Sequence, residues 1–436
     1  MEANKVNEIL GKHILADGYN LVMDFEKSYG SYIVDKLSGN EILDMFSMFA
    51  SSAVGYNHPY ILEHEAWLGK YTTFKPTLSD VYFEEYAEFM QVFERVAIPK
   101  ELSYCFFIDG GALAVENALK AAFDWKTRKN WLKNSKDEGS VVIHFEQAFH
   151  GRSGYTLSLT NTADPRKYQY FPKFDWPRIV NPKLQFPITE DNLKTTVALE
   201  EKAIAQINEA IQKHGDKVAC IIIEPIQCEG GDNQFRKEFL QQLRAICDQN
   251  EILLIFDEVQ VGMGITGKMW AYQLLGVTPD IISFGKKTQV CGILASKEKM
   301  NEVAHHVFTE SSRINSTFGG NFIDYLRLKL ILEIFEKDNL LDNVRQQGER
   351  LLSGLQALQN KFPNLISNAR GRGLLCAFDL PSGELRDKVV GNLMKEERVL
   401  ILSSGTQSVR FRPQLVVTAE EIDLALAAIE RVVGKM

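Results

Sequence analysis

The chain has 436 residues and a formal net charge of −8 at pH 7, from 49 basic and 57 acidic side chains. Hydrophobic residues make up 45% and charged residues 24%, which is typical of a soluble globular protein and excludes a disordered chain or a small disulfide scaffold. The acidic balance disfavours nucleic acid and anionic membranes as partners. The N-terminus lacks an apolar signal core, and no apolar run reaches the roughly 18 residues that span a bilayer. We expect a cytoplasmic protein.

The first quarter predicts a short helix at residues 6–15, strand-like runs over residues 20–48 and a linker at residues 72–80. From there to about Asn321, buried strands alternate with amphipathic helices, which predicts a mainly parallel sheet with helices on its faces. The expected strands are residues 104–108, 140–145, 218–223, 252–256, 281–284 and 292–295. The expected helices are residues 112–130, 235–249 and 268–275.

One connection in this region is too short for a parallel crossover. Only residues 285–291 separate the strand at residues 281–284 from the strand at residues 292–295, and a parallel crossover needs a dozen or more. We therefore expect this pair to be antiparallel, with Lys286 and Lys287 at the turn.

The last part of the chain has α+β character, which predicts a second, smaller domain. Its expected helices are residues 322–336, 341–360 and 419–433, and its strands lie around residues 374–379, 399–402 and 409–411. The predicted organisation is an N-terminal segment that belongs to the small domain (residues 1–75), a large domain (residues 76–321) and the rest of the small domain (residues 322–436).

The segment Gly262–Lys268 matches two nucleotide-binding patterns, G-x-G-x-x-G and G-x-x-x-x-G-K. We reject both. The phosphate-loop pattern requires Ser or Thr next, where this chain has Met269. In the dinucleotide pattern the glycines closely follow the strand, but here Asp257 and Glu258 intervene and would repel a pyrophosphate. A glycine-rich structural turn is preferred.

A second group of residues could carry out chemistry. Asp257 ends the strand at residues 252–256, and Lys286 ends the next apolar strand. The carboxyl ends of neighbouring parallel strands form the crevice where open α/β sheets bind ligands. A Lys can form a Schiff base with a carbonyl, and an Asp can keep a ring nitrogen protonated, which is the pairing that pyridoxal phosphate needs. On spacing alone, a structural ion pair explains the two residues equally well.

Two further segments follow predicted strands. Gly110-Gly111 opens a helix whose amides and dipole could hold a phosphate, although an ordinary βα turn would look the same. Phe149 could stack on a cofactor ring, and Arg152 could bind a carboxylate. Alone, Phe149 would be read as core and Arg152 as surface.

The order of these motifs, followed by Ser316-Thr317-Phe318-Gly319-Gly320-Asn321, resembles the class III (ω-) aminotransferases over essentially the whole chain. The resemblance implies fold type I and pyridoxal 5'-phosphate as the cofactor, with no metal ion. It makes Lys286 the Schiff-base lysine, with Lys287 as the neighbour that could be confused with it. It pairs Asp257 with the pyridine nitrogen and places Gln260 at the ring hydroxyl.

The other cofactor contacts are also implied by the resemblance. The backbone amides of Gly111 and Ala112 would bind the phosphate, where most of the class has Gly-Ser or Gly-Thr, so one hydroxyl contact is missing. Phe149 would stack on the ring. Thr317 would reach the phosphate of the partner subunit's cofactor, which implies at least a homodimer.

The segments DGGALAVENALKAAFDWK, EPIQCEGGDNQF, FGKKTQVCG and RINSTFGGN are similar to the lysine 6-aminotransferase branch of this class. That branch transfers the ε-amino group of L-lysine to 2-oxoglutarate, giving 2-aminoadipate 6-semialdehyde and L-glutamate by a ping-pong reaction. The resemblance implies that Arg152 grips the lysine α-carboxylate and that Arg410 binds a second carboxylate. Glu229 would mask Arg410 while lysine is bound.

Three alternatives remain open at this point. The chain could be another ω-aminotransferase, acting on ornithine or 4-aminobutyrate. It could be a pyridoxal phosphate enzyme that does not transaminate, such as an aminomutase or a decarboxylase. It could also bind the cofactor without turnover.

Overall fold

The computed structural model describes residues 1–73, 75 and 80–436. Its centre is a seven-stranded sheet in the order β3-β11-β10-β9-β6-β4-β5. The strands are β3 (Tyr104–Ile108), β4 (Val141–Phe145), β5 (Arg178–Ile179), β6 (Val218–Ile223), β9 (Leu253–Asp257), β10 (Ile281–Phe284) and β11 (Cys291–Ala295). β11 runs antiparallel to both of its neighbours, and the other neighbouring pairs are parallel. The predicted α/β class, the mainly parallel sheet and its one antiparallel strand are confirmed.

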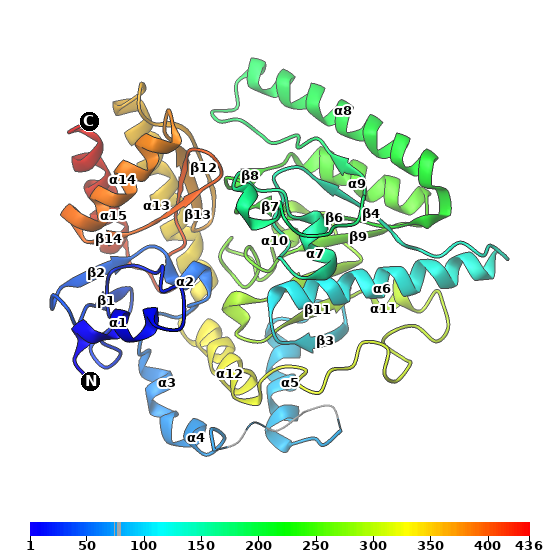
Figure 1. Cartoon of the computed structure of the whole chain (residues 1–436), viewed down its shortest axis with the longest axis horizontal. Helices are drawn as coiled ribbons and strands as arrows, with labels where there is room; N and C mark the ends of the chain where they lie inside the picture. The colour runs from blue at the N-terminus through cyan, green and yellow to red at the C-terminus, as the bar shows by residue number, and fades with distance from the viewer. Residues whose placement is uncertain (74, 76–79) are drawn as a thin grey trace.

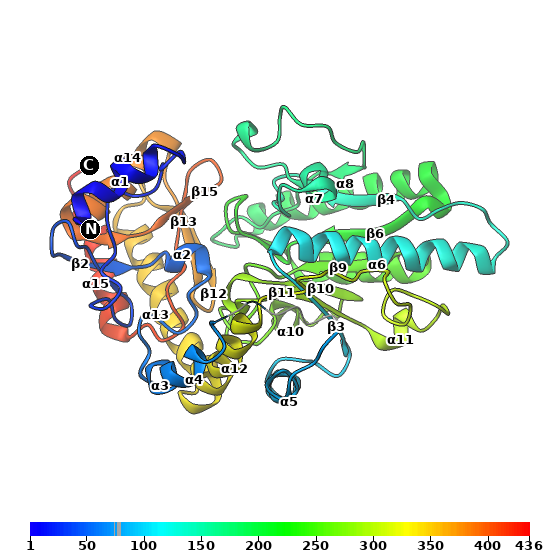
Figure 2. The same ribbon diagram turned by 60° about the horizontal axis from the view of Figure 1, so that its bottom comes forward.

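The strands are apolar on both faces because helices cover both. Along β6, Ile221 and Ile223 belong to one hydrophobic cluster, and Cys220 and Ile222 belong to the other. This alternation follows from the period of two in a strand. The second cluster is closed by α6 (Gly111–Leu132), which runs along the sheet in Figures 1 and 2. The first cluster is closed by helices that include α8 (Glu190–His214) and α9 (Lys237–Gln249).

The N-terminal and C-terminal parts of the chain gather at one end of the molecule, where both termini lie (Figures 1 and 2). Here β2 (Glu41–Asp44) pairs with β1 (Tyr32–Val34) and, in parallel, with β14 (Val399–Leu400). An antiparallel sheet in the order β12-β13-β16-β15 lies beside them. Its strands are β12 (Ser367–Arg372), β13 (Leu375–Asp379), β15 (Leu402–Ser404) and β16 (Ser408–Arg410).

The rest of the structure consists of further long helices and of short elements between the helices and strands. The long helices are α5 (Glu84–Val96), α12 (Phe322–Lys337), which packs against α5, α13 (Leu340–Lys361), α14 (Gly383–Glu397) and α15 (Ala419–Val433). The short elements are η1 (Ala3–Lys5), α1 (Val6–Gly11), α2 (Ser47–Ala50), α3 (Pro59–Glu63), α4 (Glu65–Gly69), α7 (Gly154–Leu159), η2 (Pro165–Lys167), η3 (Gly215–Lys217), β7 (Ile226–Gln227), β8 (Asn233–Gln234), α10 (Ala271–Leu275), η4 (Lys286–Thr288) and α11 (Lys297–Met300). Within the described ranges, no helix combines the length and the hydropathy that a membrane span requires.

Several details differ from the expectations. The run at residues 399–402 is two short strands in different sheets, because β14 pairs with β2 whereas β15 pairs with β16. The expected helix at residues 268–275 is reduced to α10. The expected linker at residues 72–80 lies largely outside the described residues. The domain boundaries at residues 75 and 321 stay predictions.

The glycine-rich segment after β9 is a packed turn. Gly264 has φ +87°, and a Cβ there would lie 2.6 Å from Cε1 of Phe335. The Glu258 carboxylate accepts hydrogen bonds from the amides of Ala271 (2.6 Å) and Tyr272 (2.8 Å). It therefore occupies the N-terminus of α10, where a nucleotide phosphate would have to bind. The structure accounts for these glycines without a nucleotide.

Replacing Gly264 with Ala is expected to destabilise the protein by about 3 kcal/mol, because it adds left-handed backbone strain to a clash with Phe335. The matched control is Gly391→Ala in α14, where a Cβ meets nothing within 4 Å. That change should stabilise the helix by about 0.5–1 kcal/mol. Urea midpoints measure both, and equal effects of the two variants would contradict the packed-turn interpretation.

Candidate active site

A cavity of about 730 Å³ lies at the carboxyl ends of β6 and β9 and reaches Arg410 at the end of β16. Every predicted site residue except Thr317 lines it: Gly111, Ala112, Phe149, Arg152, Glu229, Asp257, Gln260, Lys286 and Arg410. Residues that the sequence analysis did not single out complete the lining: Asp17, Phe49, His150, Gly151, Lys167, Glu224 and Val259. The structure thus brings together residues that are far apart in the chain.

Of the two adjacent lysines, only Lys286 lines the cavity. Burial lowers the pKa of its amine, and the charges of Arg410 and Arg412 lower it further. The amine of Lys287 points away and donates to the backbone carbonyls of Gln260 (3.0 Å) and Ala50 (3.4 Å). Burial lowers the pKa of Lys287 to about 7. Lys286 is therefore the lysine that a ligand in the cavity can reach.

Asp257 is fixed at the end of β9 by three hydrogen bonds. One oxygen accepts from the Ser283 hydroxyl (2.8 Å) and from the amide of Val259 (3.1 Å), and the other lies 2.8 Å from Nδ1 of His150. The side chain of Asp257 is 5% exposed. The carboxylate is thus held in a single orientation at the floor of the cavity.

The N-terminus of α6 opens on the same space. Gly110 has φ +98°, and a Cβ on Gly111 would lie 2.8 Å from Cγ1 of Val259. The amides of Gly111 and Ala112 donate to no acceptor in the part of the chain that the structure describes. Amides with this orientation, at the positive end of a 22-residue helix, suit a phosphate.

Glu229 covers Arg410. Nη2 of Arg410, which is almost fully buried, donates to Oε2 of Glu229 at 2.8 Å, and Nζ of Lys167 lies 2.5 Å from Oε1. Burial raises the pKa of Glu229, but the charges of Arg410 and Lys167 lower it overall. Arg152, in contrast, is exposed at the cavity and has no hydrogen-bond or ion-pair partner among the described residues.

Gln260 is oriented by the two arginines of β16 and the segment after it. Its side-chain oxygen accepts from Nη1 of Arg410 (3.2 Å) and from Nε of Arg412 (3.0 Å). Since the oxygen is engaged, the amide nitrogen is the group that remains for a ligand.

These groups fit pyridoxal phosphate. The open amides of α6 suit its phosphate, the fixed Asp257 carboxylate suits its ring nitrogen, and the half-buried Lys286, whose amine faces the cavity, suits its aldehyde. Phe149 and Val259 supply apolar walls for a flat ring. The roles of the individual residues stay predictions.

Sequence reasoning overlooked Glu224, although a signal for it exists. Glu224 follows β6 as Asp257 ends β9, so the strand-end rule could have found it. It accepts from the amides of Phe149 (2.8 Å) and Cys228 (3.1 Å), and burial, with the nearby charge of Asp257, raises its pKa to about 7. It therefore links the wall of the cavity to the residue before Glu229.

Other lining residues come from short helical turns and loops and gave no signal. Lys167 lies in the connection between α7 and β5, and Asp17 and Phe49 belong to the N-terminal segment. No periodicity or strand end marks such positions. Thr317 is exposed and lies outside the cavity, in the segment between α11 and α12.

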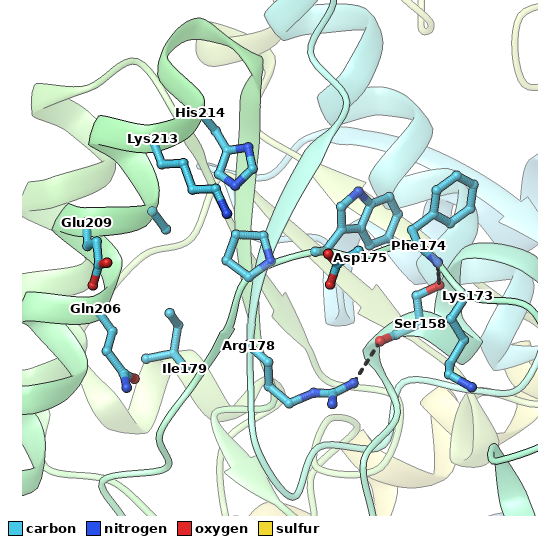
Figure 3. Close-up of a pocket in the computed structure, with 13 residues that line it drawn as sticks. Ser158, Lys173, Phe174, Asp175, Arg178, Ile179, Gln206, Glu209, Lys213 and His214 are labelled. Atoms are coloured by element: carbon cyan, nitrogen blue, oxygen red, sulfur yellow. Dashed lines mark hydrogen bonds between the residues drawn. The ribbon is translucent and has the colours of Figure 1, made fainter.

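A second cavity, of about 570 Å³, lies over β5 and α8 (Figure 3). Arg178, Lys213 and His214 line it together with Asp175 and Glu209. It contains none of the predicted site residues, and its lining mixes both signs of charge. The chemistry described above therefore belongs to the first cavity.

Comparisons with known proteins show the family of the chain. The family model of class III aminotransferases matches residues 14–433. The L-lysine-epsilon aminotransferase of Amycolatopsis lactamdurans is 47% identical over 98% of this chain and 95% of its own length. Mitochondrial 4-aminobutyrate aminotransferase of Sus scrofa is 31% identical over 92% of this chain and 82% of its own. The solved structure of lysine aminotransferase from M. tuberculosis in the internal aldimine form superposes with a TM-score of 0.97 at 46% identity, over 100% of both chains. The chain belongs to the class III aminotransferases, pyridoxal 5'-phosphate-dependent enzymes of fold type I.

Proposed function

We propose that this enzyme is an L-lysine 6-transaminase, which transfers the ε-amino group of L-lysine to 2-oxoglutarate. One observation supports this most directly. The cavity contains Arg152, which has no ion-pair partner among the residues that the structure describes, and Arg410, which is covered by a carboxylate. A diamine with one carboxylate needs the first alone, whereas a dicarboxylate needs both. The L-lysine-epsilon aminotransferase relative, at 47% identity, points to the same donor.

In the lysine half-reaction, each residue of the cavity has a separate role. When bound, the cofactor supplies the electron sink that stabilises a carbanion at the amine carbon. Arg152 binds the α-carboxylate of lysine, so that the far amine enters the cavity. Nζ of Lys286 then removes a proton from Cε, and its lowered pKa leaves more of the amine neutral and able to do so. Asp257 holds the proton on the ring nitrogen, and Gln260 donates to the ring hydroxyl.

The acceptor half-reaction reverses these roles. The amino group would stay on the cofactor when 2-aminoadipate 6-semialdehyde leaves, and 2-oxoglutarate would then enter the same space, take up that group and leave as L-glutamate. Its second carboxylate binds Arg410 once Glu229 has moved aside. Lys286 carries the proton in the opposite direction, as microscopic reversibility requires.

The active unit in this proposal is a homodimer. Thr317 is exposed and lies away from the cavity of its own chain, which is consistent with its reaching the phosphate of the partner subunit's cofactor. Gly111 and Ala112 hold the phosphate from within the chain, and Phe149 covers the ring. A cytoplasmic location stays a prediction.

The donor is tested by the absorption spectrum of the holoenzyme. L-Lysine should convert the aldehyde form of the cofactor to the amine form, and 2-oxoglutarate should restore it. Mass spectrometry should detect the cyclic imine that 2-aminoadipate 6-semialdehyde forms. A response to ornithine or 4-aminobutyrate but not to lysine would change the donor, and no response to any amine would leave a cofactor-binding protein without turnover.

Borohydride reduction separates the two lysines. In the native holoenzyme it should attach the cofactor to Lys286, and Lys286→Ala should lose the attachment and lower turnover by about 1,000-fold or more. Lys287→Met should keep the attachment while costing about 1–3 kcal/mol of stability, since two backbone carbonyls lose their donor. Peptide mass spectrometry locates the label, and a label on Lys287 would overturn the assignment.

Glu229→Ala tests the covering of Arg410. The exposed arginine would compete with Arg152 for the lysine α-carboxylate, so kcat/KM of the lysine half-reaction should fall by about 10-fold. The glutamate half-reaction should not slow. Glu201→Ala, on the exposed side of α8, is the control. Unchanged rates of both half-reactions in Glu229→Ala would refute the mask.

A further inference from the structure

The carboxylate of Glu229 is shared between two cations of different mobility. Oε2 faces Arg410, whose side chain is 2% exposed and is also held by Gln260. Oε1 faces Lys167, whose side chain is 29% exposed. Arg410 is thus the fixed partner, and Lys167, on a four-carbon stem with rotatable donors, is the movable one.

The segment that carries Lys167 is ordered at both of its ends. Asp164 caps η2 by accepting from the amide of Arg166 at 3.1 Å. At the far end, the amide of Phe174 donates to the Ser158 hydroxyl at 2.9 Å, as Figure 3 shows. The amine of Lys167 also lies 5.9 Å from the centre of the Phe149 ring, on the wall of the cavity. Its position beside Glu229 therefore follows from the local fold.

Admitting a dicarboxylate requires Glu229 to leave Arg410. A carboxylate that gives up its only cation in a partly buried site loses most of its stabilisation. Glu229 has a second cation, and the stem of Lys167 can follow it. A carboxylate divided between two cations is also bound less tightly to either one than a carboxylate that can turn both oxygens to Arg410.

We propose that Lys167 is a positioning residue for Glu229: it keeps the carboxylate paired while Arg410 is uncovered, and so lowers the cost of binding the dicarboxylate substrate. This inference rests on the proposed function, because it presumes that Glu229 moves between the two half-reactions. Lys167 acts through Glu229 and touches no reacting atom.

A simpler effect has to be separated from this one. Removing a cation from the wall would weaken the binding of any anion by direct electrostatics. The two effects differ in their dependence on Glu229. A positioning role disappears when Glu229 is absent, whereas direct attraction remains.

The test is a double-mutant cycle on the holoenzyme, with dissociation constants from titration calorimetry. The probes are glutarate, an unreactive dicarboxylate, and hexanoate, a monocarboxylate with the chain length of lysine. Lys167→Met should raise the dissociation constant of glutarate by about 10-fold and that of hexanoate by less than about 2-fold. In the Glu229→Ala background, the same change should alter glutarate binding by less than about 2-fold.

Arg166→Gln is the matched control, because it removes the neighbouring positive charge, which pairs with Asp164 and not with Glu229. It should leave both constants within about 2-fold of the native values. Lys167→Gln is a second variant in case Lys167→Met does not fold. It should show the same loss of glutarate binding.

Three results would overturn the inference: a loss of glutarate binding that persists without Glu229, equal losses for glutarate and hexanoate, or no loss at all. The outcome is separable from the donor assignment. Coupling between Lys167 and Glu229 in an enzyme that prefers another amine would retain the inference and reject lysine as the donor. Lysine turnover without coupling would do the reverse.

Discussion

The pairing of the buried Arg410 guanidinium with Glu229 is the contact on which the pocket depends. A guanidinium that is 2% exposed requires a counter-charge, and Arg410 belongs to β16, far along the chain from the loop between β7 and β8 that supplies it. Two more arginines bind to the same loop, both at Asp232. Arg412 pairs with Asp232, and Nε of Arg370 donates to the backbone carbonyl of Asp232 at 3.1 Å. Electrostatics therefore ties the C-terminal sheet to the rim of the large sheet.

These arginine contacts are also the reason why we propose that Glu229, and not Asp232, is the residue that moves. The side chains of Arg412 and Asp232 are 0% and 1% exposed, whereas that of Glu229 is 23% exposed and faces the cavity. Because the side chain of Asp232 is almost fully buried, water cannot take the place of Arg412 as its partner. The fully buried pair of Arg412 and Asp232 anchors the loop. The partly exposed carboxylate of Glu229 is the one that a ligand in the cavity can reach.

The sequence predicted the central sheet because its strands obey simple rules. The long apolar runs and the short connection of residues 285–291 each have one physical explanation, and the structure agrees with the sheet that they predict. Asp257, at a strand end, marks the edge of that sheet where ligands bind. Resemblance to a family was needed for the rest of the site. Arg152 and Arg410 carry no periodic signal, since a lone arginine beside a strand is usually a surface residue.

What the sequence could not predict depends on contacts between distant segments. The residues Ser47, Met48, Phe49 and Ala50 of α2 all have left-handed φ angles, between 44° and 66°, at a cost of about 1–2 kcal/mol each for L-residues. Asp44 offsets part of this cost by accepting from the amides of Phe46 and Ser47, both at 2.8 Å. The turn places Phe49 on the cavity wall. No local propensity predicts such a turn, because its stability comes from the surrounding structure.

The switch that we propose also keeps the reacting amine in a constant environment. Burial lowers the pKa of Lys286, and the charge of Arg410 lowers it further. A bare Arg410 would lower this pKa more than a paired one. In this proposal, Glu229 would neutralise Arg410 while lysine is bound, and the substrate's own carboxylate would do so while 2-oxoglutarate is bound. A carboxylate would therefore face Arg410 in both half-reactions while Lys286 moves its proton. One base can serve both half-reactions at the same pH because the substrate replaces the charge that it displaces.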